Sequence, residues 1–313
     1  MAQFTPKAGI DSSADWLDVH IYPLEIAFRV SNDASGWREL HRRLRAEQVE
    51  IVALEASGGC ERPACHFLLE RGYSVRRLDA YRVRQFAKAT GKLAKNDRID
   101  AEVIALFVAT VPTRPMVRDV RRERLAALVG ARAQLMDHLT LLQNQARGHR
   151  DHLLCKLDKR RTARLQADIK EIEQHITKVI AADPDLAADN ALLRSMKAVG
   201  PVLAFTLQAF LPELGHLTRK QIASLAGVAP FEDQSGKRQG VRYIQGGRAS
   251  VRGPLYMAAL IAGRFNPILK ETRDRLRALN KKPKVVTVAV MRRMLTILNA
   301  ILRDGTVWQN KAA

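Results

Sequence analysis

Asp97 and Asp100 stand three residues apart at the start of an apolar-periodic stretch, and their spacing suggests chemistry. On a helix, residues three apart share one face, with Cβ atoms roughly 5–6 Å apart. Two carboxylates held that close repel each other unless a cation or a proton intervenes. In a chain of formal net charge +20, the pair favours a hard divalent metal. The alternative is a helix-capping Asp97 followed by an ordinary first-turn acid, which the helix dipole favours.

Two further acids follow predicted strands upstream. Asp11 comes directly after a short apolar strand core, and Glu55 ends the continuous apolar strand 49–54. In mixed α/β sheets, ligands gather at the carboxyl ends of the central strands. The helix with Asp97 and Asp100 can pack across that edge. We therefore expect the four acids to bind one or two Mg²⁺ ions, which prefer oxygen ligands and support phosphodiester displacement.

The elements that must position these acids follow the order β-β-β-α-β-α-β-α-α. Alternating and continuous apolar runs predict the strands, and apolar residues three and four apart predict the helices. The expected strands cover 8–10, 17–21, 27–30, 49–54 and 73–78, and the expected helices cover 37–44, 63–71, 82–88 and the stretch from 97. This order predicts an α/β domain at residues 1–117.

Three segments that carry the acids resemble the Asp/Glu/Asp/Asp motifs of the DEDD transposases. The segments are Gly9-Ile10-Asp11-Ser12-Ser13, Leu54-Glu55-Ala56-Ser57-Gly58-Gly59 and Lys95-Asn96-Asp97-Arg98-Ile99-Asp100-Ala101. Those proteins are insertion-sequence recombinases with a RuvC-like, ribonuclease-H-type N-terminal domain. The resemblance implies that Asp11, Glu55, Asp97 and Asp100 are the catalytic, Mg²⁺-binding acids of a DNA transposase.

The pattern changes to long helices over residues 118–182, where apolar residues recur at three and four. Such rows predict a helical hairpin or coiled coil that supports dimerisation. We expect its turn near 151–164, where basic residues cluster. Lys159, Arg160 and Arg161 are either nucleic-acid contacts or an ordinary solvated face. Residues 183–313 then form a mainly helical domain, so the predicted class is α/β plus all-α.

Ser235 is the candidate nucleophile of the C-terminal half. A Ser-Gly pair in a polar loop is typical of a turn. The stretch 193–263, however, resembles the C-terminal domain of the same transposases. In that domain, a serine five residues after a proline is the proposed nucleophile. Ser235 follows Pro230 at the same spacing. We interpret Ser250 as a helix cap among phosphate-contacting arginines. The expected nucleic-acid contacts here are Lys237, Arg238, Arg248 and Arg252. A metal-activated water is the alternative nucleophile.

Composition indicates the partners. The chain has 52 Lys and Arg against 32 Asp and Glu, so we expect it to bind a polyanion. The resemblance implies donor and target DNA, a structured guide RNA encoded beside the gene, and a homo-oligomer of two or more copies. The chain has three cysteines without zinc-site spacing and shows no secretory signal. It has no apolar run near the roughly 18–20 residues of a membrane span. These observations predict a cytoplasmic protein away from membranes. A non-enzymatic nucleic-acid-binding scaffold is the other alternative.

Overall fold

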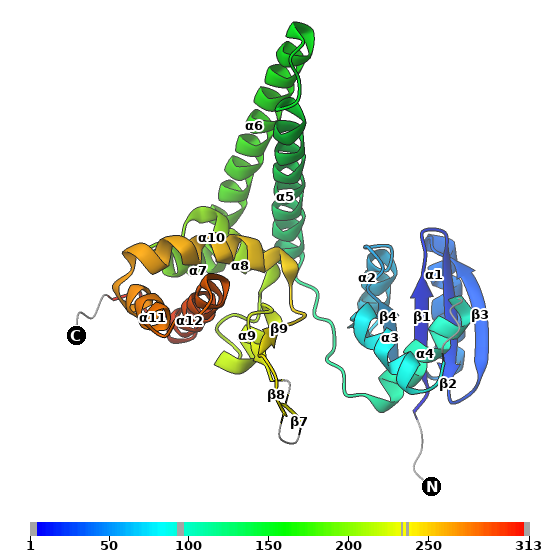
Figure 1. The fold of residues 1–313 in the computed structure, drawn as a ribbon. Helices are drawn as coiled ribbons and strands as arrows, with labels where there is room; N and C mark the ends of the chain where they lie inside the picture. The colour runs from blue at the N-terminus through cyan, green and yellow to red at the C-terminus, as the bar shows by residue number, and fades with distance from the viewer. Residues whose placement is uncertain (1–4, 93–96, 233, 236–237, 310–313) are drawn as a thin grey trace. The chain divides into compact units, whose positions relative to one another are not determined.

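The computed structural model describes residues 5–92, 97–232, 234–235 and 238–309, and the side chains of residues 97, 98, 235, 238 and 239 lie outside the described part. The chain forms two compact units, residues 1–118 and residues 119–313 (Figure 1). The helices expected between 118 and 182 belong to the second unit. The division into three domains stays a prediction.

A five-stranded mixed sheet forms the centre of the first unit. Its strand order is β3-β2-β1-β4-β5, with β1, β2 and β3 antiparallel and β4 and β5 parallel to β1. The strands are β1 Lys7–Ser12, β2 Trp16–Tyr22, β3 Ile26–Ser31, β4 Ile51–Glu55 and β5 Ser74–Leu78, and the helices are α1 Ala34–Ala46, α2 Arg62–Glu70, α3 Ala80–Ala89 and α4 Asp97–Thr110. The predicted element order and the α/β class of this unit are confirmed.

One face of this sheet packs against α1 and α2. Ala8 and Ile10 of β1 and Leu54 of β4 are fully buried there, in one cluster with Leu40 of α1 and Leu68 of α2. Successive side chains of a strand point to opposite faces. The odd-numbered residues of β1 and β4 therefore point to the other face of the sheet.

That other face packs against α3 and α4. Ala53 of β4 lies in a cluster with Val83 of α3 and Ile104 and Phe107 of α4. The sheet is thus covered on both faces, which explains why β4 reads as a continuous apolar run and not as an alternating one.

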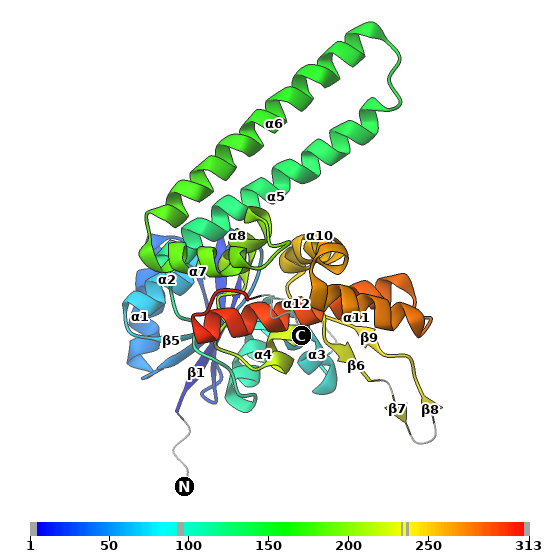
Figure 2. The ribbon, with the colours of Figure 1, turned by 90° about the vertical axis from the view of Figure 1, so that its left-hand side faces the viewer.

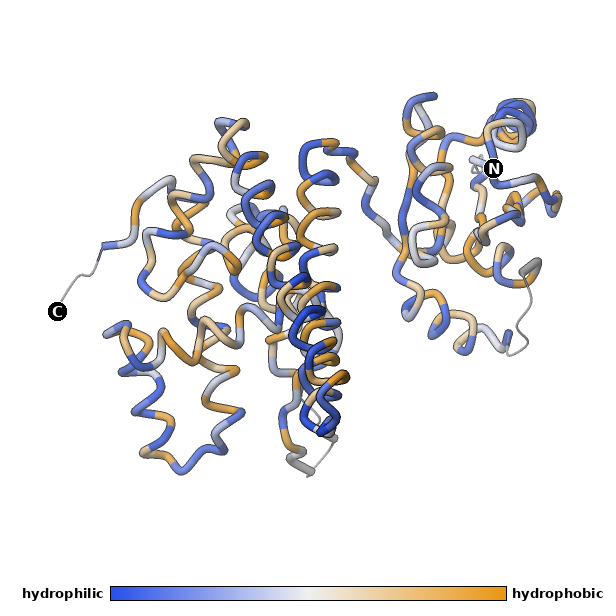
Figure 3. Tube along the Cα trace, turned by 90° about the horizontal axis from the view of Figure 1, so that it is seen from above, coloured by the Kyte–Doolittle hydropathy of each residue, from blue (hydrophilic) through white to orange (hydrophobic). Residues whose placement is uncertain are grey.

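Two long helices begin the second unit: α5 Val120–Ala146 and α6 His152–Ala181. They lie side by side (Figures 1 and 2), and Arg132 Nε of α5 donates to Glu173 Oε1 of α6 at 2.6 Å. Figure 3 shows both hydrophilic and hydrophobic residues in the helical part of the second unit. The structure thus has a helical hairpin, and a supercoil stays a prediction.

The predicted position of the hairpin turn was wrong. The chain turns at residues 147–151, and residues 152–164 are a continuous part of α6. Gly148 lies in the turn, and Asp151 caps α6 by accepting hydrogen bonds from the amides of Leu153 and Leu154. Residues 152–164 contain neither glycine nor proline, so nothing in them interrupts a helix.

Six further helices and two short strand pairs complete the second unit. The helices are α7 Pro184–Ser195, α8 Pro201–Phe210, α9 Arg219–Leu225, α10 Ala249–Phe265, α11 Pro267–Ala278 and α12 Pro283–Asp304; β6 Pro230–Phe231 pairs with β9 Tyr243–Ile244, and β7 Gln234–Ser235 with β8 Arg238–Gln239. Their shared core is aliphatic, with Leu203, Leu255 and Leu295 among its buried residues.

Helix α12 corrects the prediction that no apolar run is long enough to span a membrane. Its 22 residues satisfy that test by length and composition. Its apolar side is covered, however, with Met294, Leu295 and Leu298 fully buried in the core. We therefore describe α12 as the core helix of the second unit. It ends at Gly305, which is left-handed at φ +61°.

Candidate active site

Asp11 and Glu55 lie at the carboxyl ends of adjacent parallel strands. The register of β1 with β4 pairs Gly9 with Ala53 and Ile10 with Leu54, so Asp11 and Glu55 are each one step beyond the last pair. Both are partly buried. Since side chains alternate between faces, both acids share the face of Gly9 and Ala53, which α4 covers.

Gly9 explains how α4 approaches this edge. A Cβ atom at Gly9 would lie 2.2 Å from the amide nitrogen of Ala105 and 2.4 Å from the carbonyl oxygen of Ala101, both in the α4 backbone. The helix therefore lies directly on β1 where the strand has no side chain. Only a glycine allows this close approach.

The start of α4 carries the other two predicted acids. Asp97 is its first residue, four before Ala101, and Asp100 is partly buried and directly precedes Ala101. Residues four apart share a helix face, so the Asp97 position lies on the face that meets β1, although its side chain is outside the described residues. The backbone thus places all four predicted acids at positions around one face of the sheet, on three separate elements.

A fifth acid on this face, Asp18, was missed by sequence reasoning. It lies directly opposite Asp11 in the register of β1 with β2, and opposite Arg29 in the register of β2 with β3. Arg29 donates to both carboxylate oxygens of Asp18, at 2.9 Å from Nε and 2.8 Å from Nη2. This forked ion pair neutralises Asp18, so we separate it from the four predicted acids.

A buried carboxylate, Glu61, holds the loop that follows Glu55, and it was also missed. It is fully buried and accepts hydrogen bonds from the amides of Ser57 at 3.2 Å and Gly59 at 2.9 Å. It also pairs with Arg77, whose Nε is 2.8 Å away. Burial alone would raise the pKa of Glu61, but these hydrogen bonds and the charge of Arg77 hold it below its ordinary value.

The same loop is tied to the end of β1. Ser57 Oγ is 2.8 Å from the hydroxyl of Ser12, which follows Asp11 and is buried. Ser57 is thus a residue of the loop after β4. These contacts of Glu61, Ser57 and Ser12 connect the ends of β1 and β4. They therefore hold the backbones of Asp11 and Glu55 at a fixed distance from each other.

The donor atoms at this edge fit a hard divalent cation. The predicted ligands are carboxylates only, and oxygen is the ligand that Mg²⁺ prefers. Among the described side chains, which exclude Asp97, no three His, Cys, Asp or Glu residues lie close enough to hold a metal ion. The fit therefore rests on the strand register and on the donor chemistry, and a metal that drew the acids together would complete the site.

Ser235 lies in β7, where it pairs with Arg238 of β8 in a short hairpin. Gln234 beside it is exposed. The side chains of Ser235 and Arg238 and the whole of Lys237 lie outside the described residues. The hairpin backbone thus carries Ser235 in the second unit, whereas the four acids belong to the first unit.

Ser250 is not a helix cap, contrary to prediction. The cap of α10 is Arg248, and Ser250 is the second residue of the helix, two positions after the cap. Arg248 donates to both carboxylate oxygens of Glu213 at 2.6 Å and to the carbonyl of Phe210 at 2.8 Å. Arg252 donates to the carbonyl of Gly246. Both arginines hold the loop before α10, and their contact with nucleic acid stays a prediction.

The basic cluster of α6 is exposed. Lys159, Arg160 and Arg161 all face solvent. The neighbouring Asp158 is buried and accepts a hydrogen bond from His149 at 2.6 Å across the hairpin turn. Consecutive residues on a helix point in different directions, so the three cations spread around the outer side of α6 and not along a single line.

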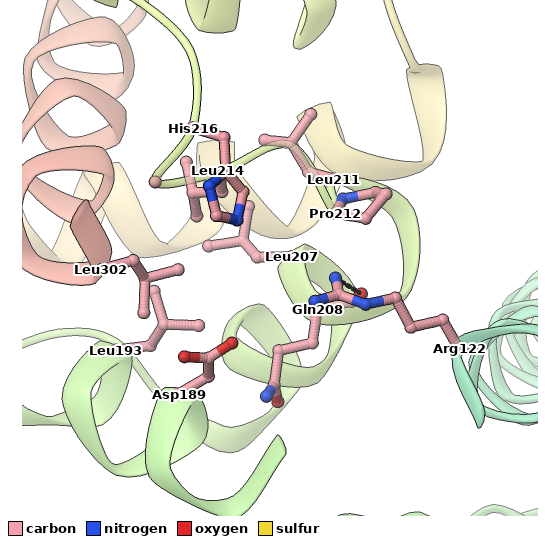
Figure 4. Close-up of a pocket in the computed structure, with 11 residues that line it drawn as sticks. Arg122, Asp189, Leu193, Leu207, Gln208, Leu211, Pro212, Leu214, His216 and Leu302 are labelled. Carbon is pink, nitrogen blue, oxygen red and sulfur yellow. Dashed lines mark hydrogen bonds between the residues drawn. The ribbon is translucent and has the colours of Figure 1, made fainter. Parts of the chain in front are cut away.

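A small cavity of about 90 Å³ in the second unit offers different chemistry (Figure 4). Arg122 of α5 donates to the carbonyl of Gln208 at 3.4 Å beside Asp189 of α7. Burial raises the pKa of Asp189, although the charges of Arg122 and His216 act in the opposite direction. Among the described residues, the lining of the cavity holds a single carboxylate and no hydroxyl or thiol, so this part of the lining lacks the groups that phosphodiester cleavage needs.

Comparison with known proteins places the chain among transposases. A family model of DEDD transposases of IS110 matches residues 8–155, and a second model, for transposases of the IS116/IS110/IS902 family, matches residues 190–273. The pilin gene-inverting protein of Moraxella bovis is 25% identical over 288 residues, 88% of each chain. An uncharacterised 43.6 kDa protein of the IS110 insertion element of Streptomyces coelicolor is 25% identical over 227 residues, covering 68% of this chain and 55% of that protein. A solved structure of T. thermophilus RuvC in complex with a Holliday junction substrate matches 36% of this chain and 99% of its own, with 16% identity and a TM-score of 0.29.

Proposed function

This chain belongs to the IS116/IS110/IS902 family of transposases, which are enzymes of DNA strand transfer, and we propose that Asp11, Glu55, Asp97 and Asp100 form its metal-dependent catalytic centre. The observation that carries this proposal is the β1–β4 register, which puts Asp11 and Glu55 side by side on the face that α4 covers. The non-enzymatic scaffold does not fit membership of this family.

The four carboxylates would hold Mg²⁺, the divalent ion that we expect. When bound, such an ion neutralises charge on the scissile phosphate and activates an attacking oxygen. The protein's own part is to bind and orient. Glu61 and Arg77 hold the loop behind Glu55, and Gly9 lets α4 bring its acids to β1. The forked pairing with Arg29 cancels the charge of Asp18 beside the centre.

We assign the nucleophile to Ser235, on the resemblance of its loop to the family's serine loop. A serine hydroxyl attacks poorly until its proton is removed. In the step that we propose, a bond forms from Ser235 Oγ to phosphorus while one phosphorus–oxygen bond of the DNA strand breaks. The hydroxyl gives up its proton, and the released sugar oxygen takes one up. The covalent link preserves the phosphodiester energy for joining a new strand, and attack by water would lose it.

The partners follow from this reaction. DNA is the substrate, and the Moraxella relative is named for inverting a pilin gene, which is also a rearrangement of DNA. The resemblance to the DEDD transposases implies a homo-oligomer of two or more copies, and we include it in the proposal. A guide RNA would read sequence by base pairing and leave backbone binding to the protein. We place this DNA-directed activity in the cytoplasm.

The test of the acids uses Asp11→Asn and Asp100→Asn on a labelled DNA substrate that carries the ends of the element. Both variants should lose strand cleavage and keep nucleic-acid binding, because removing a negative charge does not weaken attraction to a polyanion. Asp18→Asn is the matched control, since it makes the same change one strand away and should retain cleavage. Wild-type cleavage in Asp11→Asn would refute the assignment.

The test of the nucleophile is a denaturation-resistant protein–DNA adduct. Wild-type protein should form it with nicked substrate in Mg²⁺, and Ser235→Ala should form none and should not join strands. Ser250→Ala is the matched control, because Ser250 is an exposed serine of the same unit. Normal strand joining by Ser235→Ala, without an adduct, would assign the attack to water.

A further inference from the structure

Helices α10, α11 and α12 enclose a second cavity, of about 160 Å³, on the C-terminal side of the second unit. The three helices pack against one another in Figures 1 and 2. Ala259 of α10 and Val290 of α12 line the cavity and belong to the shared core of the unit. The cavity is separate from the residues that we assigned to the reaction.

Positive charge dominates the wall of this cavity. Four cations line it, Arg264 from α10, Arg273 and Arg277 from α11, and Lys284 from α12, and no acidic side chain that the structure describes does so. Arg273 pairs with Asp274 at 2.7 Å. The other three form no ion pair with an acid among the described residues, which leaves their charge available to a ligand.

The N-terminus of α12 adds to this charge. Pro283 is the first residue of the 22-residue helix, and both Pro283 and Lys284 line the cavity. The helix cap, Lys282, supplies no side-chain hydrogen bond to the first amides. The positive end of the helix dipole thus lies at the border of the cavity, near the four cations.

The floor of the cavity is apolar. The buried residues Gly263 of α10 and Val286 and Val290 of α12 form it, and Tyr256 also lines the cavity. A cavity with cations on its wall and an apolar floor suits a phosphate that carries a carbon skeleton better than it suits a free inorganic ion. A sugar–phosphate unit has this combination.

We propose that this cavity binds one backbone phosphodiester of the nucleic acid on which the chain acts, with the phosphate among Arg264, Arg277 and Lys284 and the adjoining sugar on the apolar floor. The proposal rests on the proposed function only in that the chain handles nucleic acid. It does not depend on the catalytic acids or on Ser235.

The experiment measures binding of a labelled DNA duplex of mixed sequence, and of a labelled single-stranded RNA, over a series of salt concentrations. EDTA is present throughout, so failure of the metal-dependent cleavage proposal does not alter the result. The cavity variant is Arg264→Gln, Arg277→Gln and Lys284→Gln together. The matched control is Arg194→Gln, Arg219→Gln and Lys220→Gln, which removes three exposed cations of the same unit away from the cavity.

With duplex DNA, the cavity variant should lose about one unit of the log–log salt slope, since each neutralised duplex phosphate contributes about 0.9. The control variant should keep the wild-type slope. A change with only one of the two probes assigns the phosphodiester to that nucleic acid. Equal slopes for the cavity and control variants with both probes would overturn the proposal.

Two further measurements exclude other occupants. Calorimetry with inorganic phosphate should show no binding that the cavity variant loses, and phosphate binding as tight as nucleic acid would overturn the backbone assignment. Size-exclusion chromatography should show the same oligomeric state for both variants. A changed state with an unchanged salt slope would assign the cavity to a second copy of the chain. Should the triple variant not fold, Arg277→Gln alone keeps the test, because Arg277 is exposed.

Discussion

Replacing Gly9 by alanine tests the contact on which the candidate active site depends. The new Cβ would lie 2.2 Å from the Ala105 nitrogen and 2.4 Å from the Ala101 oxygen. Both atoms belong to the backbone of α4, so no side chain can rotate away to make room. The helix must move off β1, or the strand must bend.

The size of the effect follows from this geometry. Overpacking by one methyl group costs about 1–3 kcal/mol, and we expect about 3 kcal/mol because the obstacle is backbone. With a urea dependence of about 2 kcal/mol per molar, the midpoint of unfolding should fall by about 1.5 M. Cleavage should fall further than stability predicts, since a shift of about 1 Å in a catalytic group costs about 100-fold in rate.

The assay is urea unfolding followed by tryptophan fluorescence. In a Trp308→Phe background, the emission comes from Trp16 and Trp37, which both lie in the first unit. The matched control is Gly130→Ala in α5, where a Cβ meets nothing within 4 Å. In a background without Trp16 and Trp37, this control should gain about 0.5–1 kcal/mol, because alanine favours a helix interior more than glycine does.

The same substitution should therefore destabilise at one glycine and stabilise at the other. If Gly9→Ala unfolds at the wild-type urea concentration and cleaves at the wild-type rate, α4 does not lie on β1. The convergence of the acids on one face would then lose its structural basis.

Three other predictions concern the surroundings of the site and the hairpin. Glu61→Ala should lower the free energy of unfolding in urea by about 3 kcal/mol and should reduce cleavage. The loss is at the lower end for a broken buried ion pair because Arg77 is partly exposed. Glu61→Gln should recover part of both losses, and equal losses in the two variants would contradict the role of the hydrogen bonds. Folding lowers the pKa of Glu61, so its ionised carboxylate stabilises the fold above the unfolded pKa of about 4.3. This stabilisation is lost as the pH falls through the lower pKa of the folded state. The free energies of unfolding of wild type and Glu61→Gln, measured in urea across that pH range, should therefore converge at low pH. Replacing Lys159, Arg160 and Arg161 by glutamine should reduce the salt dependence of DNA binding if these residues contact the DNA backbone. An unchanged slope would mean that they form only a solvated helix face.

Local pattern alone predicts much of the first unit. Alternating and continuous apolar runs determine the strands and helices there, because each run matches one structural period. The positions of Asp11 and Glu55 at strand ends follow directly, since each acid comes where an apolar run stops. The end of α12 at Gly305 is also local, because only the backbone conformation of one residue decides it.

Other features depend on partners that are distant in the chain, and only the tertiary structure decides them. Asp18 meets Arg29 because β2 and β3 pair in one particular register, and a shift of one residue between them would put the two side chains on opposite faces of the sheet. Arg248 pairs with Glu213, which lies 35 residues away in the chain, and no local pattern shows this ion pair.

The catalytic arrangement itself shows the same division. The sequence determines which residues carry carboxylates and how they are spaced on α4. It does not determine that α4 lies on β1 at Gly9, because that contact joins residues about ninety positions apart and depends on the missing side chain of one glycine. Nor does any local pattern show that Glu61, buried and paired with Arg77, holds the loop behind Glu55. The residue types thus determine which chemical groups the site can use. The geometry of the site comes from packing between segments that only the folded chain brings together.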